Sequence, residues 1–212
     1  MEPVDRPLRA DAERNRRAII CAAGDVFAHE GTSVTLEHIA EVAGVGVGTV
    51  YRRFRTVEDL VAVVFEEKMI RYADEAERAA ERALTEPREA FRDFVMFMLE
   101  QQADDLAFSD VILSPGLGTD LFRTQSRRAL SASRQLVTRA RAAGAVRPDF
   151  HETDFYMLLH ANAGLVRSTR RSAPTAWRRF GQYMLQSFQH QEGELDPPSR
   201  TWMRAGSLAD QQ

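Results

Sequence analysis

The sequence has little of several residue types, and each shortage narrows the possible functions. Its 212 residues include one cysteine, Cys21, so the chain can form no internal disulfide and no thiolate metal cluster. No apolar run approaches the length of about 18 residues that a membrane helix needs, and the first residues contain no apolar leader segment. We therefore expect a globular protein of the cytoplasm without membrane contact, in which Cys21 packs as a small apolar side chain.

An excess of one charge sign is also missing. The formal net charge is -3, and residues 1–55 contain eight basic and eight acidic side chains. Of the 28 basic residues 27 are arginines, and Lys68 is the one lysine. This balance excludes a uniformly basic surface, so binding to nucleic acid would have to depend on where individual basic residues lie.

The common catalytic and metal-binding patterns do not occur either. None of the 17 glutamates has a histidine three residues later, as the helical di-iron enzymes require. His-Glu-x-x-His and Gly-x-Ser-x-Gly are missing as well. We expect no metal, no cofactor and no enzymatic activity, with a helical enzyme kept as an alternative.

The apolar residues that are present follow the period of an α-helix, and no segment shows the alternation of a strand. From Ile19 to Phe27 they recur at intervals of three and four, and Gly31 ends this first helix. Thr35 supplies a capping hydroxyl, which predicts a second, short helix that ends at Gly44. Its expected inner face consists of Leu36, Ile39, Ala40 and either Val42 or Ala43.

The segment AGVGVGTVYRRF, residues 43–54, contains three glycines at alternate positions before a basic, aromatic run. A dinucleotide-binding loop needs a preceding strand and different glycine spacing, and a phosphate-binding P-loop needs a Lys-Ser/Thr pair, so neither fits. The glycines instead predict a turn and a third helix from Val47 to about Phe54, followed by a fourth that starts at Thr56. This order is typical of a helix-turn-helix unit.

The third helix has an inner and an outer side. Val50 and Phe54 define the inner side, and Arg52 points away from it beside Gly48. The flanks carry Thr49, Arg53, Tyr51 and Arg55. Arginine can bind guanine through two hydrogen bonds and hydroxyl groups can bind phosphate, so this surface suits a DNA major groove. The alternative is a solvated basic helix end.

Residues 16–60, and above all the pattern G-T-x-Y-x-x-F, resemble the amino-terminal domain of TetR-type transcriptional regulators. The resemblance implies an all-α homodimer of about nine helices per chain, with a three-helix DNA-binding domain joined to a larger ligand-binding and dimerisation domain. It also implies a repressor that a small-molecule effector releases from a palindromic operator; a ligand-independent regulator or an activator of the same fold is the alternative.

The resemblance assigns roles to individual residues. Thr35, Thr49 and Tyr51 match positions that contact the DNA backbone, and Arg52 matches a position that reads bases. Many members have serine and lysine where Gly46 and Val47 stand, and lysine where Val57 stands, so some phosphate contacts must come from elsewhere. The predicted DNA-binding residues are Thr35, Gly46, Val47, Gly48, Thr49, Tyr51, Arg52, Arg53, Arg55 and Thr56.

The second half of the chain predicts an effector site among its helices. The segment 88–106 is apolar nearly all round, which predicts a central helix, and a face of the helix 120–143 is narrow and partly polar. That face lines a cavity or is loosely packed surface. Asn162 lies on an apolar stripe and either pairs inside the protein or contacts the effector. The predicted effector residues are Phe94, Met98, Phe122, Ser126, Phe155, Leu159 and Asn162.

Two last helices, over about 152–172 and 174–191, each have a broad apolar surface. The resemblance suggests that they pair with their copies in a four-helix dimer interface, which small residues would allow to approach closely. The predicted interface residues are Met157, Ala161, Gly164, Ser168, Trp177, Phe180 and Met184.

These assignments divide the chain into residues 1–55 for DNA binding, 56–191 for effector binding and dimerisation, and a disordered tail over 192–212. The first segment includes a basic stretch from Arg6 to Arg17. It is either a flexible arm that touches DNA or a solvated tail.

Overall fold

The computed structural model describes residues 5–113, 120–189, 193 and 195–197, with side chains described from residue 11 on. Over these ranges it contains nine helices and no strand, which confirms the predicted all-α fold. The helices are α1 (Asp5–Glu30), α2 (Leu36–Ala43), α3 (Val47–Tyr51), α4 (Val57–Arg82), α5 (Pro87–Asp104), α6 (Leu106–Ile112), α7 (Asp120–Ala142), α8 (Asp154–Thr169) and α9 (Ala176–Gln189). The predicted break at 114–119 and most of the predicted tail lie outside the described residues.

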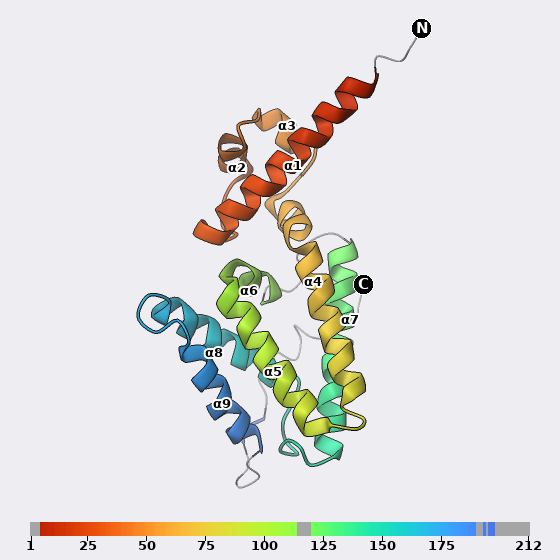
Figure 1. Ribbon diagram of the computed structural model, residues 1–212, viewed down its shortest axis with the longest axis vertical. Helices are drawn as coiled ribbons and strands as arrows, with labels where there is room; N and C mark the ends of the chain where they lie inside the picture. The colour runs from red at the N-terminus through yellow and green to blue at the C-terminus, as the bar shows by residue number, and fades with distance from the viewer. Residues whose placement is uncertain (1–4, 114–119, 190–192, 194, 198–212) are drawn as a thin grey trace.

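The molecule is elongated, with helices α1 to α3 grouped at one end (Figure 1). Helix α4 starts at this group and runs the length of the remaining body, where it packs along α7. Helices α5, α6, α8 and α9 complete the body. The group of α1 to α3 and helix α9 therefore lie at opposite ends of the molecule (Figure 1).

The three helices of the upper group share a small core of their own. Helix α1 contributes Ile19 and Phe27, α2 contributes Ile39, and Val50 and Phe54 fix α3, all of them at most 5% exposed. The last inward position of α2 is Ala43, which packs against this core, whereas Val42 is 50% exposed. The apolar spacing read from the sequence thus gives the correct inner faces, and the structure decides the choice between Val42 and Ala43 that the sequence left open.

Aromatic rings connect the upper group to the body. Phe27 of α1 stacks on Phe65 of α4 at 6.2 Å between centroids, and Phe65 packs on Phe108 of α6 at 5.8 Å. Lys68 of α4 donates a hydrogen bond to Asp105, whose other carboxylate oxygen accepts from the Phe108 backbone amide and so caps α6. One continuous set of contacts therefore runs from α1 through α4 to α6.

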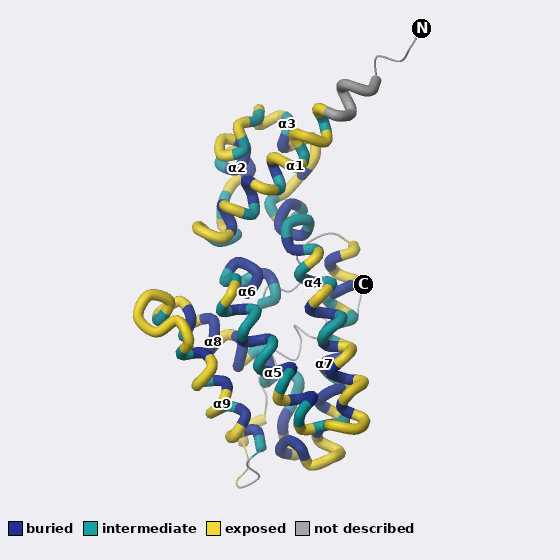
Figure 2. The backbone as a smooth tube through the Cα atoms, in the orientation of Figure 1, coloured by how far each residue is buried: buried dark blue, intermediate teal, exposed yellow. Residues whose placement is uncertain are grey.

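Helix α5 lies in the middle of the body, as its sequence predicts. It is buried along much of its length (Figure 2) and packs against α4, α7, α8 and α9. Its approach to α9 is close: a Cβ atom added at Gly181 would lie 2.7 Å from Leu99 Cδ1. Glycine at position 181 thus allows α9 to pack against α5 at this distance.

Four details differ from the sequence predictions. Helix α3 ends at Tyr51 instead of about Phe54, because Arg52 is its C-cap and a turn begins there. Helix α1 starts at Asp5, so the basic stretch to Arg17 is helical, where i,i+3 and i,i+4 pairs join Arg14 to Asp11 and Arg17 to Glu13. Cys21 is exposed because it lies off the apolar stripe of α1. Helix α8 is shorter than predicted at both ends. Within the described ranges, none of the helices is long and apolar enough to cross a bilayer.

Candidate functional site

The position of α3 is fixed by capping and by buried anchors. The Thr35 hydroxyl accepts a hydrogen bond from the His38 amide at 3.2 Å and caps α2, and Gly44 ends α2 with φ of 65°. This left-handed conformation favours glycine and turns the chain towards α3. The anchors Val50 and Phe54 then hold α3 by its inner side. The predicted helix-turn-helix geometry is thereby confirmed.

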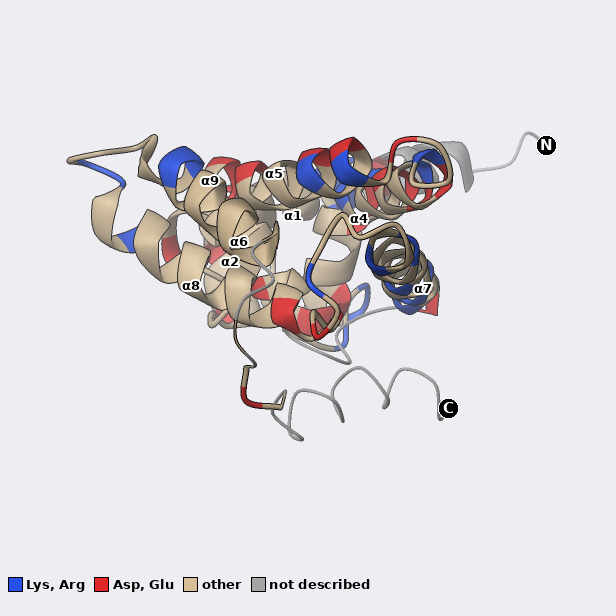
Figure 3. Ribbon diagram, turned by 90° about the horizontal axis from the view of Figure 1, so that it is seen from below, with Lys and Arg blue, Asp and Glu red and all other residues tan. Residues whose placement is uncertain are grey.

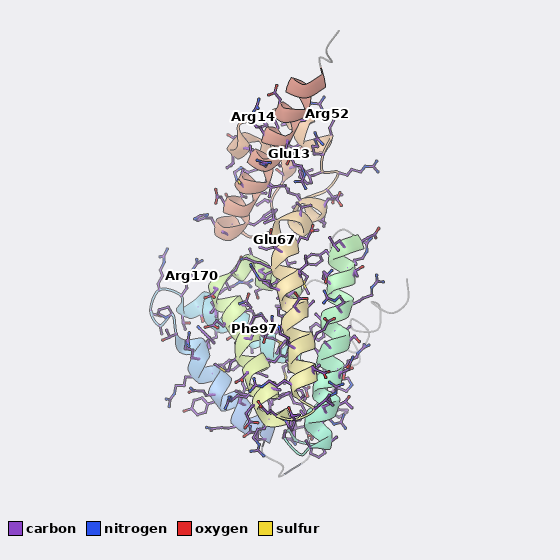
Figure 4. All side chains as sticks on the ribbon, turned by 45° about the vertical axis from the view of Figure 1, so that its right-hand side comes forward. Glu13, Arg14, Arg52, Glu67, Phe97 and Arg170 are labelled. Carbon is purple, nitrogen blue, oxygen red and sulfur yellow. The ribbon has the colours of Figure 1, made fainter. Side chains whose placement is uncertain are left out.

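The outer side of α3 is open to solvent. Arg52, Arg53 and Arg55 are exposed, and a Cβ atom added at Gly48 would meet nothing within 4 Å. The Arg52 guanidinium donates to Thr49 Oγ1 at 3.2 Å. Figure 4 shows Arg52 at the α1–α3 end of the molecule. A groove of DNA could therefore approach these side chains.

The ten predicted DNA-binding residues fall into two kinds. Eight of them lie between Gly46, the N-cap of α3, and Arg55, in the turn after this helix. Of these, Thr49 is half-buried, and the exposed ones include Val47, Gly48, Tyr51, Arg52, Arg53 and Arg55. Thr35 and Thr56 instead cap α2 and α4 by accepting backbone hydrogen bonds. A capping hydroxyl keeps its own hydrogen, which it can still donate to a phosphate oxygen.

One contact on this surface does not follow from the sequence patterns. The Tyr51 hydroxyl donates a hydrogen bond of 2.6 Å to Glu37 Oε1, and this joins the end of α3 to the start of α2. The bond lowers the pKa of Glu37 and raises the pKa of Tyr51, because it favours the ionised carboxylate and the protonated phenol. From the sequence, Glu37 is recognisable only as an acidic residue in the first turn of a helix. Its contact with Tyr51 could not be predicted, because it depends on how α2 packs against α3.

Most predicted effector residues meet where α5 packs on α8. Phe94 and Phe155 are in edge contact at 6.1 Å between centroids, and Met98 and Leu159 are also buried. Asn162 is completely buried and donates to the Leu99 carbonyl at 3.3 Å and to Gln102 Oε1 at 3.0 Å. Its amide nitrogen thus pairs inside the protein, while its own Oδ1 is buried and has no hydrogen-bond partner among the described residues.

The other two predicted effector residues lie on α7, which packs against α4 and α5. Phe122 is buried and Ser126 is half-buried, with its hydroxyl donating to the Phe122 carbonyl at 3.0 Å. An open groove of about 360 Å³ lies along the outer edge of α7, next to α4. None of the predicted effector residues lines this groove, which is bounded by Glu77, Thr124, Arg127, Arg128, Ser131, Ala132 and Gln135.

The predicted interface residues of α8 lie on its exposed side. Met157 is 44% exposed, Ala161 and Ser168 are exposed, and the surroundings of Gly164 are open. On α9, Phe180 and Met184 are partly buried against the core, and the neighbouring Tyr183 is exposed although no prediction included it. Trp177 is 5% exposed and packs in the chain's own core, with the Arg178 guanidinium over its ring, so little of its surface is left for a partner.

Comparison with known proteins adds to this geometry. Residues 19–64 match the profile of bacterial regulatory proteins of the tetR family, and residues 86–183 match the C-terminal domain of SbtR-like transcriptional regulators. An HTH-type transcriptional regulator of Staphylococcus aureus (strain MRSA252) is 33% identical over 72 residues, which are 32% of this chain and 37% of that protein. The chain thus matches little more than a third of this curated relative's length.

Two solved structures extend over most of the chain. The TetR regulatory protein of Mycobacterium vanbaalenii is 32% identical and matches 86% of this chain and 99% of that chain, with a TM-score of 0.45. The FadR regulator of Bacillus subtilis, solved with stearoyl-CoA, has a TM-score of 0.56 at 20% identity, with 82% of this chain and 100% of that chain covered; it shows the fold. The two family profiles together match more than half of the chain, so the chain belongs to the TetR family of helix-turn-helix transcriptional regulators.

Proposed function

We propose that this regulator is a cytoplasmic repressor that binds a roughly palindromic operator as a homodimer and is released by a small-molecule effector. The observation that carries the proposal is the outer side of α3, where Arg52, Arg53 and Arg55 are exposed around the open Gly48. Buried Val50 and Phe54 hold this helix in place, so its outer groups are presented rigidly. Such a surface can contact base edges and phosphates in one major groove.

A second copy supplies the second recognition helix. Two copies of α3 would enter successive major grooves about 34 to 36 Å apart, which is one turn of DNA. The exposed side of α8 and the adjoining side of α9 support the pairing, because Gly164 leaves room for a close neighbour and Met157 and Tyr183 are exposed apolar groups.

This part of the proposal is tested by Gly164→Glu. A carboxylate on the contact surface should convert a dimer into a monomer in sedimentation velocity, since burying an unpaired charge in an interface is costly. The matched control is Arg170→Glu, which places the same group on an exposed site beyond the end of α8. A Gly164→Glu protein that sediments as the wild type does would contradict this interface.

The contact between α5 and α8 supports an effector site. Phe94, Met98, Phe155 and Leu159 at this contact are buried and apolar, and the buried Asn162 Oδ1 is an acceptor that a ligand's donor could satisfy. The B. subtilis protein of this fold was solved with stearoyl-CoA, so a helical body of this kind has room for a ligand in at least one case. To reverse operator occupancy completely, an effector must favour the released form by about 5.5 kcal/mol.

The experiment that tests the function uses the DNA upstream of the protein's own coding region. Footprinting should reveal a protected, inverted-repeat site, and in-vitro transcription from that fragment should fall when the protein is added. An increase in transcription on adding the protein would favour the activator alternative. If neither this fragment nor any duplex selected from a random library is bound better than random DNA, the proposal is wrong.

A further inference from the structure

The Tyr51 hydroxyl is committed to another residue on the surface proposed to meet DNA. A tyrosine hydroxyl has one hydrogen to donate, and here Glu37 Oε1 accepts it at 2.6 Å. Phosphate oxygens are acceptors and need a donor. As long as this bond persists, Tyr51 cannot donate to a phosphate, although 47% of its surface is exposed at the end of α3.

The partner carboxylate also brings negative charge to this surface. Glu37 is exposed, and its contact with Tyr51 places the carboxylate beside the outer side of α3. A negative group near a phosphate backbone opposes binding to any DNA sequence, since sequence-independent affinity is mainly electrostatic. Glu37 thus opposes phosphate contacts in two ways, through its charge and through the Tyr51 donor that it occupies.

We propose that Glu37 is a specificity-determining residue that weakens binding to non-operator DNA more than binding to the operator. The inference rests on the proposed DNA-binding role of the α3 surface. On random DNA, α3 can shift along the groove until a freed Tyr51 meets a phosphate. On the operator, base contacts fix the register, so a freed hydroxyl gains less. Glu37 therefore makes binding depend more strongly on base contacts.

Two substitutions separate the two effects. Glu37→Gln removes the charge but keeps a carbonyl oxygen that can accept from Tyr51. Glu37→Asp keeps the charge at the start of α2, where it favours the helix, but its shorter side chain withdraws the acceptor from Tyr51. Glu41→Gln is the matched control: Glu41 is an exposed acid on the same helix, and no hydrogen bond joins it to Tyr51 among the described contacts.

The probes are a random-sequence duplex of about 30 base pairs and the best duplex selected from a randomised library, measured by fluorescence anisotropy at several salt concentrations. Glu37→Asp should bind the random duplex about three- to tenfold more tightly than wild type does, with a smaller gain on the selected duplex, because it frees the Tyr51 hydroxyl. Glu37→Gln, which changes only the charge, should strengthen binding to both duplexes by similar factors. Glu41→Gln should change both affinities by less than either Glu37 variant does.

The Tyr51→Phe background tests whether Glu37 acts through the tyrosine. There, Glu37→Asp should lose its effect on the random duplex, whereas Glu37→Gln should keep the part due to charge. Equal gains of Glu37→Asp on both duplexes, or no gain, would overturn the specificity role, and so would an effect of Glu37→Asp that persists without the Tyr51 hydroxyl. A wild-type protein that does not prefer any selected duplex would instead refute the proposed function itself.

Discussion

Arginines at the two ends of the molecule have different surroundings. In the body, Arg128 of α7 donates to Asp74 and Glu77 of α4, and Arg178 of α9 donates to Glu100 of α5. At the α3 end, Arg53 and Arg55 have no ion-pair partner among the described residues. Acidic and basic positions are intermixed over the body, which Figure 3 shows from the end opposite α3. The composition alone cannot distinguish these arginines, whereas their neighbours can.

The difference teaches where DNA affinity can arise in a chain without a net positive charge. A guanidinium that already binds two carboxylates has few donors left for phosphate, and its local charge is neutralised. Exposed guanidinium groups without acidic partners keep both their donors and their charge. A few such residues at the end of α3 and in the turn after it can therefore act as a local basic surface, even though residues 1–55 are neutral overall.

The largest expected effect comes from removing the support of the α3 end. Phe54→Ala deletes a buried ring whose loss should lower the free energy of unfolding by about 3 to 5 kcal/mol, measured by urea denaturation. Operator binding should be lost as well, because α3 would no longer be held in place. If the variant binds the selected duplex normally while being destabilised, rigid presentation of α3 is not required.

Arg52→Ala should have the next largest effect, and on binding instead of stability. Truncation should cost about 1 to 3 kcal/mol on the selected duplex and relax the base preference at one position of the site. Stability should hardly change, since the side chain is exposed and, among the described residues, donates a side-chain hydrogen bond only to the Thr49 hydroxyl. Equal losses on selected and random DNA would contradict a base-reading role.

A pair of substitutions with the same change in charge tests the comparison directly. Arg53→Ala should weaken binding to all sequences and reduce the slope of log K against log salt by about 1. Arg128→Ala also removes one positive charge, yet it should leave DNA binding unchanged and cost less than about 1 kcal/mol of stability. Equal DNA effects would show that total charge matters and that placement does not.

The features that local rules govern could be predicted from the sequence. The caps at Thr35 and Thr56, the turn at Gly44 and the inner positions Val50 and Phe54 each depend on residues within one or two helical turns. Their agreement with the structure follows from this short range. The predicted effector and interface residues stay predictions, although the structure places five of the former between α5 and α8 and most of the latter on exposed surface.

Features that depend on distant segments could not be predicted. Trp177 looks like an interface residue on an amphipathic helix, and only the packing of α9 on α5 shows that the subunit buries it. The Tyr51–Glu37 bond likewise joins residues that are 14 positions apart. The pairing of Arg128 with α4 joins residues that are at least 51 positions apart. Helical periodicity predicts which side of a helix is apolar, but it does not say which neighbour covers that side.

The smallest expected effects come from replacing one glycine at each end of the molecule by alanine. Gly48→Ala should raise the free energy of unfolding by about 0.4 to 1 kcal/mol, because alanine favours the helix and its methyl group meets no atom within 4 Å. The same methyl group lies on the surface proposed to meet DNA, so affinity for the selected duplex should fall. Thermal unfolding and anisotropy on one preparation would measure both changes.

Gly181→Ala is the counterpart in the body, where the added methyl would lie 2.7 Å from Leu99 Cδ1 and 2.9 Å from the Met96 sulfur. These are ends of flexible side chains that can move, so a loss of about 1 kcal/mol is expected, at the lower limit for overpacking, with DNA affinity unchanged. At position 181 glycine serves packing, and at position 48 it serves access. If Gly48→Ala stabilised the protein without weakening DNA binding, α3 would not approach DNA closely at this point.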